Sequence, residues 1–308
     1  MLGTLLAVGS AAVFGVNSTV IRRGVLRASP SFIATISILI GPVYFLLVSM
    51  ASGEILKLAG FTWQAYVFFA VAGVIHFALG RTFGYRAIQH LGSTRASVMA
   101  GLSDVVGVVL AITVLQEVLT PVMALGICFS LSGPTLIALK ANSSANQIQP
   151  ELNSIEKSAN GNAVHIGLLY GVGSAIFWGS SAIFIKFGLA SGGSSIAGLL
   201  ISYAAAALAV LPSLRDREIK SAILAPERNS VQLAVMSGLT SCTAQMLRFL
   251  ALAQGSVIVV SVVGRSSPIW VLIFGFIFNR KYETFSRWVI LGNTLLLIGT
   301  VLIATQWR

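Results

Sequence analysis

Apolar residues gather in long runs along the chain, and short polar stretches separate the runs. The hydrocarbon core of a bilayer is about 30 Å thick, so a helix needs about 20 apolar residues to cross it. Runs near that length lie at about residues 2–22, 31–51, 65–88, 94–116, 119–139, 164–186, 195–214, 231–253, 256–278 and 285–305. The pattern therefore predicts an all-α integral membrane protein with about ten transmembrane helices.

One polar segment interrupts this pattern near the middle of the chain. Residues 141–162 are rich in Ser and Asn and have no apolar period, which is typical of a hydrophilic linker. The linker separates residues 1–140 from residues 163–308, and each part holds five of the predicted helices. Some neighbouring helices are only a few residues apart, as at His90–Ser93, so we expect tight antiparallel hairpins there.

The two halves contain the same short sequence motifs. Residues 9–24 read GSAAVFGVNSTVIRRG and residues 173–188 read GSAIFWGSSAIFIKFG. Later in each half, EVLTPVMALGICFSLSG matches ETFSRWVILGNTLLLIG, which aligns Glu117, Thr120, Gly126 and Gly133 with Glu283, Ser286, Gly292 and Gly299. Two matches in the same order indicate a duplicated unit.

The odd number of helices in each half has a geometric consequence. Five crossings leave the second repeat to start on the opposite side of the bilayer, so the two five-helix repeats are predicted to be inverted. Inverted repeats are typical of secondary transporters, whose substrate site lies at the repeat interface near the membrane midplane.

Composition agrees with a membrane location. Only 9% of the 308 residues are charged and 56% are hydrophobic, whereas soluble domains carry about 25% charged residues. The net charge of +11 could suggest nucleic acid, but most basic residues lie beside apolar runs, where headgroup contact and topology explain them better. We expect a multi-pass protein of the cell (plasma) membrane, a monomer or homodimer, whose partners are the lipid bilayer and a small-molecule substrate, with no nucleic acid.

The repeated motifs also carry a resemblance. Phe14-Gly15 and Trp178-Gly179 in the first helix of each repeat, together with the segments that begin at Glu117 and Glu283, resemble the drug/metabolite transporter superfamily, EamA type. The resemblance implies five-plus-five helices and transport of amino acids, metabolites, sugars or drugs. Members often carry an arginine in the second helix of a repeat, and residues 31–51 and 195–214 have none.

Ionisable residues inside the predicted helices are candidates for the site. Each costs at least about 2.5 kcal/mol on insertion scales, so each needs a partner, a cavity or a route to the interface. They are His76, Arg81, Arg86, Asp104, Arg248 and Arg265. Their mostly positive charge predicts attraction of an anionic or carboxylate-bearing substrate; the alternative for Arg81, Arg86 and Arg248 is that they extend to the membrane interface.

Arg265 lies about ten residues into its helix and shares a face with Ser261 and Pro268. Proline frees a backbone carbonyl, and a cation beside a distorted helix is typical of broken-helix binding sites. Asp104, in the matching helix of the first repeat, could pair with Arg265, bind substrate or carry a proton. His76 is the other candidate for coupling because an ordinary histidine titrates near neutrality; structural pairing is the alternative for both.

Further candidates for structural and substrate-binding roles lie in the repeated motifs. Gly15 and Gly179 predict close packing of helices, whereas the neighbouring Asn17 and Trp178 are predicted to bind substrate, with interhelical hydrogen bonding and packing as the alternatives. Glu117 and Glu283 are predicted to cap the fifth and tenth helices, where a carboxylate meets a favourable helix dipole.

These features predict a secondary transporter that moves small organic metabolites, such as amino acids, by alternating access and without ATP. HExxH, Walker A and clustered Cys and His motifs are all absent from the sequence, so we expect no enzyme activity, cofactor or metal. The alternative is a membrane-embedded enzyme or lipid-handling protein, which would need a fixed catalytic constellation in one cavity.

The distribution of basic residues predicts the orientation. Loops after odd-numbered helices hold most of them, among them Arg22, Arg23, Arg27, Arg215 and Lys281. The positive-inside rule then places both termini outside the cytoplasm, whereas the family resemblance implies both inside. From the charge count, a C-terminal reporter that works only in the cytoplasm is expected to be inactive; activity of that reporter would contradict the charge-based orientation.

Overall fold

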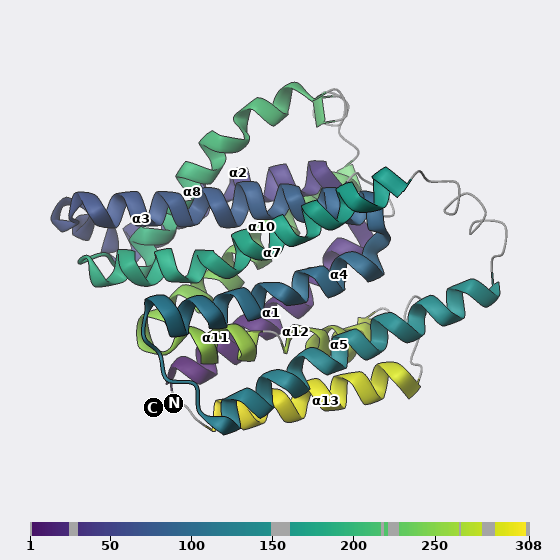
Figure 1. Ribbon diagram of the computed structural model, residues 1–308. Helices are drawn as coiled ribbons and strands as arrows, with labels where there is room; N and C mark the ends of the chain where they lie inside the picture. The colour runs from purple at the N-terminus through teal and green to yellow at the C-terminus, as the bar shows by residue number, and fades with distance from the viewer. Residues whose placement is uncertain are drawn as a thin grey trace.

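The computed structural model describes residues 2–24, 30–148, 161–216, 219–220, 228–264, 266–278 and 287–305. Within these ranges every regular element is a helix (Figure 1), which confirms the all-α prediction. Four of the described helical stretches are long and apolar enough to cross a membrane: Phe32–Ala51, Trp63–Gly84, His165–Ala190 and Ser195–Arg215. Shorter apolar helices accompany them, and the total of ten spans stays a prediction.

The first half of the chain contains α1 (Leu2–Gly24), α2 (Pro30–Ala51), the 3-10 helix η1 (Glu54–Gly60), α3 (Trp63–Gly73), the π-helix η2 (Val74–Gly80), α4 (Arg81–Val114) and α5 (Pro121–Ile148). The second half contains α7 (Gly161–Ala190), α8 (Ser195–Val210), the 3-10 helix η3 (Leu211–Arg215), α10 (Arg228–Gln254), α11 (Val257–Gly264), α12 (Ser267–Phe278) and α13 (Arg287–Ala304). Helices satisfy their own backbone hydrogen bonds, which apolar segments in a bilayer require.

Helix α5 is longer than the sequence predicted. It continues through Ile148, into the segment expected to be linker. An established helix extends at little cost because each added residue gains one backbone hydrogen bond, so a polar segment can prolong it beyond the apolar run. The remaining linker residues, 149–160, lie outside the described part of the chain.

Helix α4 is a single helical element, but it cannot be straight. Phe83 lies against Gly173 of α7, and Met99 lies against Gly171. In a straight helix, positions 83 and 99 would be about 24 Å apart, whereas Gly171 and Gly173 are within one turn of each other. The chain therefore reverses direction within α4, as the hairpin predicted near His90–Ser93 requires.

Helices α5 and α13 cross through glycines that occupy equivalent positions in the two repeats. A Cβ added to Gly133 would collide with the carbonyl of Gly292, and a Cβ added to Gly299 would collide with the carbonyl of Gly126. Because Gly126 corresponds to Gly292 and Gly133 to Gly299, the two helices run antiparallel and exchange equivalent contacts, as a two-fold axis requires. This crossing supports the predicted inversion of the repeats.

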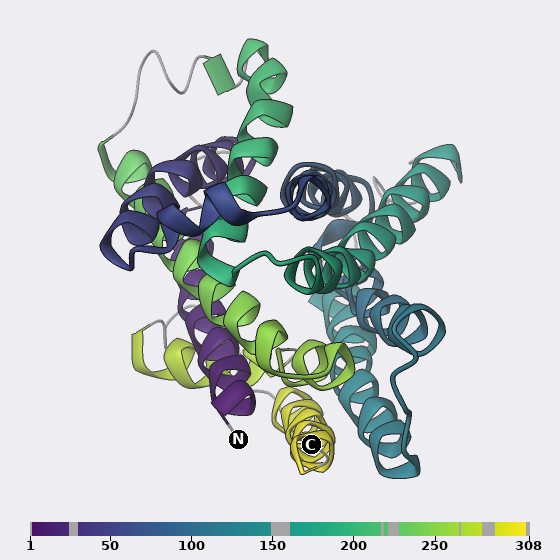
Figure 2. The same ribbon diagram turned by 90° about the vertical axis from the view of Figure 1, so that its left-hand side faces the viewer.

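The first helix of each repeat packs against the other repeat. Helix α1 lies along α10 and α12, whereas α7 lies along α4 and α3 (Figure 2). An added Cβ on Gly15 would meet the Cβ of Trp270 at 2.5 Å, and one on Gly179 would meet the Cβ of Val106 at 2.7 Å. Both glycines thus lie where helices approach closely, which is the position their predicted packing role requires.

Both chain ends lie at the same end of the helices, as Figures 1 and 2 show.

Large buried aromatic side chains join α2, η2 and α8: Phe45 and Tyr203 have ring centroids 5.1 Å apart, and Phe77 stacks on Tyr203 at 4.1 Å. Buried hydroxyls add interhelical hydrogen bonds, such as that from Ser202 Oγ to the Phe69 carbonyl at 2.7 Å. Packing and polar contacts of this kind hold membrane helices together.

Candidate functional site

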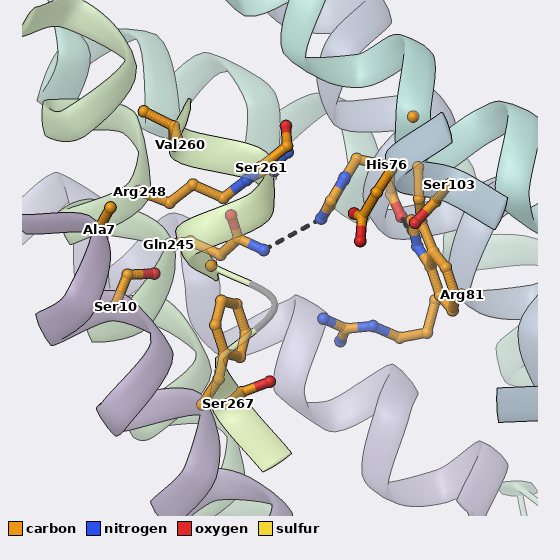
Figure 3. Close-up of a pocket in the computed structure, with 15 residues that line it drawn as sticks. Ala7, Ser10, His76, Arg81, Ser103, Gln245, Arg248, Val260, Ser261 and Ser267 are labelled. Atoms are coloured by element: carbon orange, nitrogen blue, oxygen red, sulfur yellow. Dashed lines mark hydrogen bonds between the residues drawn. The ribbon is translucent and has the colours of Figure 1, made fainter. Parts of the chain in front are cut away.

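A cavity of about 360 Å³ lies between helices of the two repeats (Figure 3). Its wall comes from α1, η2 and α4 of the first repeat and from α7, α10, α11 and α12 of the second. Ligand pockets range from about 300 to 1,000 Å³, so the cavity suits a small molecule. Several residues singled out in the sequence line it: His76, Arg81, Asp104, Trp178, Gly179 and Arg248.

Two helices lose their regular geometry at this cavity. Residues Val74–Gly80 form a π-helix, a local feature that is frequent at functional sites. The carbonyl of His76, within that segment, accepts a hydrogen bond from Trp178 Nε1 at 3.1 Å. Trp178 lines the cavity, and this hydrogen bond from its indole N–H stabilises η2.

The predicted ninth helix is interrupted. Helix α11 ends at Gly264 and α12 begins at Ser267, and both of these residues line the cavity. Pro268 lies in the first turn of α12, where its missing N–H costs least. Arg265 lies outside the described residues, so its role in substrate binding stays a prediction.

His76 joins the two repeats through both of its ring nitrogens. Its Nδ1 lies 2.8 Å from Ser181 Oγ, which itself donates to the Trp178 carbonyl at 2.7 Å. A serine has one hydroxyl proton, so Nδ1–H donates to Ser181 and Nε2 accepts from Gln245 Nε2 at 3.0 Å. The dashed line in Figure 3 marks this last hydrogen bond.

The charged residues of the cavity come from both repeats. Arg81 Nη1 donates to Ser37 Oγ at 2.6 Å, and its guanidinium carbon lies 6.0 Å from the Phe77 ring centroid, within cation–π range. Asp104 interacts electrostatically with Arg248. Two arginines and one aspartate line the described wall, which leaves a net positive charge.

Arg86 lies elsewhere. It is exposed, donates to the Tyr170 hydroxyl at 2.8 Å and stacks over the Tyr170 ring with its guanidinium carbon 5.4 Å from the centroid. Of the three arginines for which the sequence left an interfacial position open, Arg86 alone is absent from the cavity lining.

Asn17 is also absent from the cavity lining. Its side chain is 6% exposed and joins α1 to α10: Nδ2 donates to Ser241 Oγ at 3.0 Å, and Oδ1 accepts from Ser237 Oγ at 2.9 Å and Thr240 Oγ1 at 3.0 Å. Its amide therefore already has protein partners, and the geometry favours interhelical hydrogen bonding, which was the alternative to substrate binding.

Glu117 caps a different helix from the one that the sequence predicted. Its carboxylate accepts hydrogen bonds from Val257 N at 2.7 Å, Ile258 N at 3.1 Å and Ser256 Oγ at 2.7 Å, so it caps α11 of the other repeat. The start of α5 is capped by Thr120, whose Oγ1 accepts from Met123 N at 3.2 Å. The correction arises because folding brings the loop before α5 beside the start of α11. Glu283 lies outside the described residues.

Sequence reasoning missed Gln245, which lines the cavity and is 3% exposed. Uncharged hydroxyls of the wall were also missed, among them Ser10, Ser103 and Ser267. A search confined to ionisable residues passes over them. The available signal for Gln245 was its place one helical turn before Arg248 on the same helix face.

Comparison with protein families now adds to this geometry. The model of the EamA-like transporter family matches residues 1–139 and 165–305. The chain belongs to the EamA-like transporter family. This membership confirms the resemblance that the repeated motifs indicated, and together with the apolar helices it identifies an integral multi-pass membrane protein of a transporter family.

A solved crystal structure shares the fold of this EamA-like chain. The two agree with a TM-score of 0.75 over 99% of this chain and 98% of the other, at 15% sequence identity. At that identity the likeness concerns the fold alone. No curated protein shows a significant sequence match to the chain.

Proposed function

We propose that this EamA-like protein is a secondary transporter of small, carboxylate-bearing metabolites in the cell membrane. The observation that carries the proposal is the net positive cavity between the repeats, lined by Arg81, Arg248 and Asp104. A buried guanidinium binds a carboxylate well because its planar donors match the two oxygens. Small acids such as amino acids fit both the charge and the volume of about 360 Å³.

Transport by alternating access is supported by the arrangement of the repeats. The glycine crossing of α5 and α13 relates the repeats by an approximate two-fold, and the interrupted α11–α12 segment meets the cavity between them. In transporters built from inverted repeats, one repeat moves against the other around a central site, and discontinuous helices commonly form that site. We extend this mechanism to the present chain.

His76 and Asp104 are the proposed coupling groups. Both line the cavity, and His76 is hydrogen-bonded to residues of the other repeat at both ring nitrogens. A change in its protonation would therefore alter contacts that join the repeats. Intramembrane acids and histidines form proton relays in pumps and transporters.

Thermal stabilisation of the purified protein by a panel of small acids and their amides tests the proposal. A ligand that binds only the folded state raises the midpoint of unfolding, so we expect the acids to stabilise and the amides to have little effect. The variant Arg248→Ala should weaken binding of the acids by roughly tenfold or more, since a lost charge-assisted hydrogen bond costs about 1.5–3 kcal/mol.

Arg86→Ala is the matched control, because Arg86 is an exposed arginine of α4 outside the cavity lining. It should bind the acids as the unmodified protein does. Equal loss of binding in both variants, or no loss in Arg248→Ala, would argue against the proposed site. Absence of solute movement in liposomes for every stabilising acid, under any ion gradient, would argue against transport itself.

A further inference from the structure

Gln245 is a deeply buried polar side chain at the cavity wall. It lies on α10, is 3% exposed, and lines the cavity beside Arg248. Its Nε2 donates to His76 Nε2 at 3.0 Å, whereas its Oε1 is buried and has no hydrogen-bond partner among the described residues. Buried polar atoms are almost always hydrogen-bonded, so an unpaired one at a cavity calls for an explanation.

The orientation of this amide follows from the hydrogen bonds behind it. Ser181 donates its proton to the Trp178 carbonyl, which makes His76 Nδ1 a donor and His76 Nε2 an acceptor. The NH2 group of Gln245 therefore faces His76, and its carbonyl oxygen faces away from that ring. The relay through three helical segments, α7, η2 and α10, positions an acceptor at the wall of the cavity.

Arg248 offers the complementary group one helical turn further along α10. Its Nη1 is also buried and has no hydrogen-bond partner within the described part of the chain. Side chains three residues apart on a helix are neighbours, with Cβ atoms about 5–6 Å apart. Both residues also line the cavity, so a small ligand bound there lies beside both side chains.

We propose that Gln245 is a specificity-determining residue: its Oε1 accepts a hydrogen bond from a donor that the substrate carries beside its carboxylate, while Arg248 binds the carboxylate. This inference rests on the proposed function and narrows it. The substrate class becomes small carboxylic acids with a hydroxyl or an ammonium group on the carbon next to the carboxylate. A simple carboxylate would satisfy Arg248 and leave the Gln245 carbonyl unpaired, which is how polar sites reject ligands that lack a donor.

The test compares three acids of similar size: propionate, which has no donor beside the carboxylate, lactate, which has a hydroxyl, and alanine, which has an ammonium group. Binding to the purified full chain is measured by calorimetry or thermal stabilisation. We expect lactate or alanine to bind about tenfold more tightly than propionate, the factor that one hydrogen bond to a buried polar group supplies. In Gln245→Leu this preference should fall to about one, with propionate binding retained.

Thr243→Val is the matched control. Thr243 lies on the same helix, outside the cavity lining, and shares a hydrogen bond with the Tyr44 hydroxyl at 3.0 Å. It should keep the tenfold preference. If Gln245→Leu does not fold, equal affinities of the three acids for the unmodified protein would still overturn the inference.

The outcomes separate the two proposals. If none of the three acids binds, the proposed function for carboxylates fails and this inference fails with it. If propionate binds as tightly as lactate and alanine, or if Gln245→Leu keeps the preference, the inference fails while the carboxylate site stands. A preference for propionate would likewise contradict the inference, because propionate has no donor for the Gln245 carbonyl.

Discussion

Replacing Glu117 by alanine is expected to lower the stability of the protein by roughly 2–4 kcal/mol, because a charged acceptor of three hydrogen bonds is lost. The Glu117 carboxylate holds two backbone N–H groups and a hydroxyl at the start of α11. The first N–H groups of a helix have no partner within the helix, and the helix dipole favours a negative charge there. The midpoint of thermal unfolding in detergent measures the loss.

Glu117→Gln refines this test. Glutamine keeps the shape of the side chain but removes the charge and turns one acceptor into a donor, so we expect an intermediate loss. Lys57→Gln is the control: Lys57 is exposed and its Nζ donates to the Glu54 carboxylate at 2.9 Å, and ion pairs of exposed side chains contribute at most about 1 kcal/mol. Equal effects of the two glutamine substitutions would show that the α11 cap does not stabilise the protein.

Replacing Gly133 by alanine is expected to force α5 and α13 apart. The added Cβ would collide with the backbone carbonyl of Gly292, which cannot move away as a flexible side chain can. Overpacking costs typically about 1–3 kcal/mol, and close approach of backbones is a main source of helix association in membranes. We therefore expect a clear fall in the unfolding midpoint, and a larger one for leucine.

The symmetry of the crossing provides a second readout. Gly299 is the repeat equivalent of Gly133 and meets the Gly126 carbonyl in the same way, so Gly299→Ala should cost about as much as Gly133→Ala. Ser132→Ala is the control, since Ser132 is exposed and its hydroxyl donates to the Phe129 carbonyl of its own helix at 2.9 Å. A tolerated alanine at Gly133, or strongly unequal costs at the two glycines, would contradict a close two-fold crossing.

Much of the fold could be predicted from patterns along the sequence. Apolar runs of bilayer length predicted helices whose bounds mostly agree with those of the structure. The repeated glycines predicted the duplication, and the α5–α13 crossing uses the same four glycines. The free-energy cost of placing ionisable residues inside a membrane singled out His76, Arg81, Asp104 and Arg248. The structure brings these four side chains to one cavity.

The features that the sequence did not predict depend on contacts between separate helices. Asn17 bonds to α10 and Glu117 caps α11, and both of those helices belong to the other repeat. The π-helix Val74–Gly80 has no signature in the apolar pattern, because its irregular turns are stabilised by neighbours such as Trp178. Gln245 carries no charge, so its importance appears only when His76 lies beside it.

The sequence by itself determined that this chain enters a membrane as helices, that it consists of two related halves, and which charged residues need a partner inside the bilayer. These properties depend on the local cost of placing each residue in lipid and on the repetition of short motifs, both of which are visible along the chain. Only the tertiary structure decided which helix Glu117 caps, that Asn17 hydrogen-bonds to α10, and that Gln245 lies beside His76 at the cavity. Those outcomes depend on hydrogen bonds between residues more than a hundred positions apart or across a shared cavity, and such contacts arise only when the helices pack.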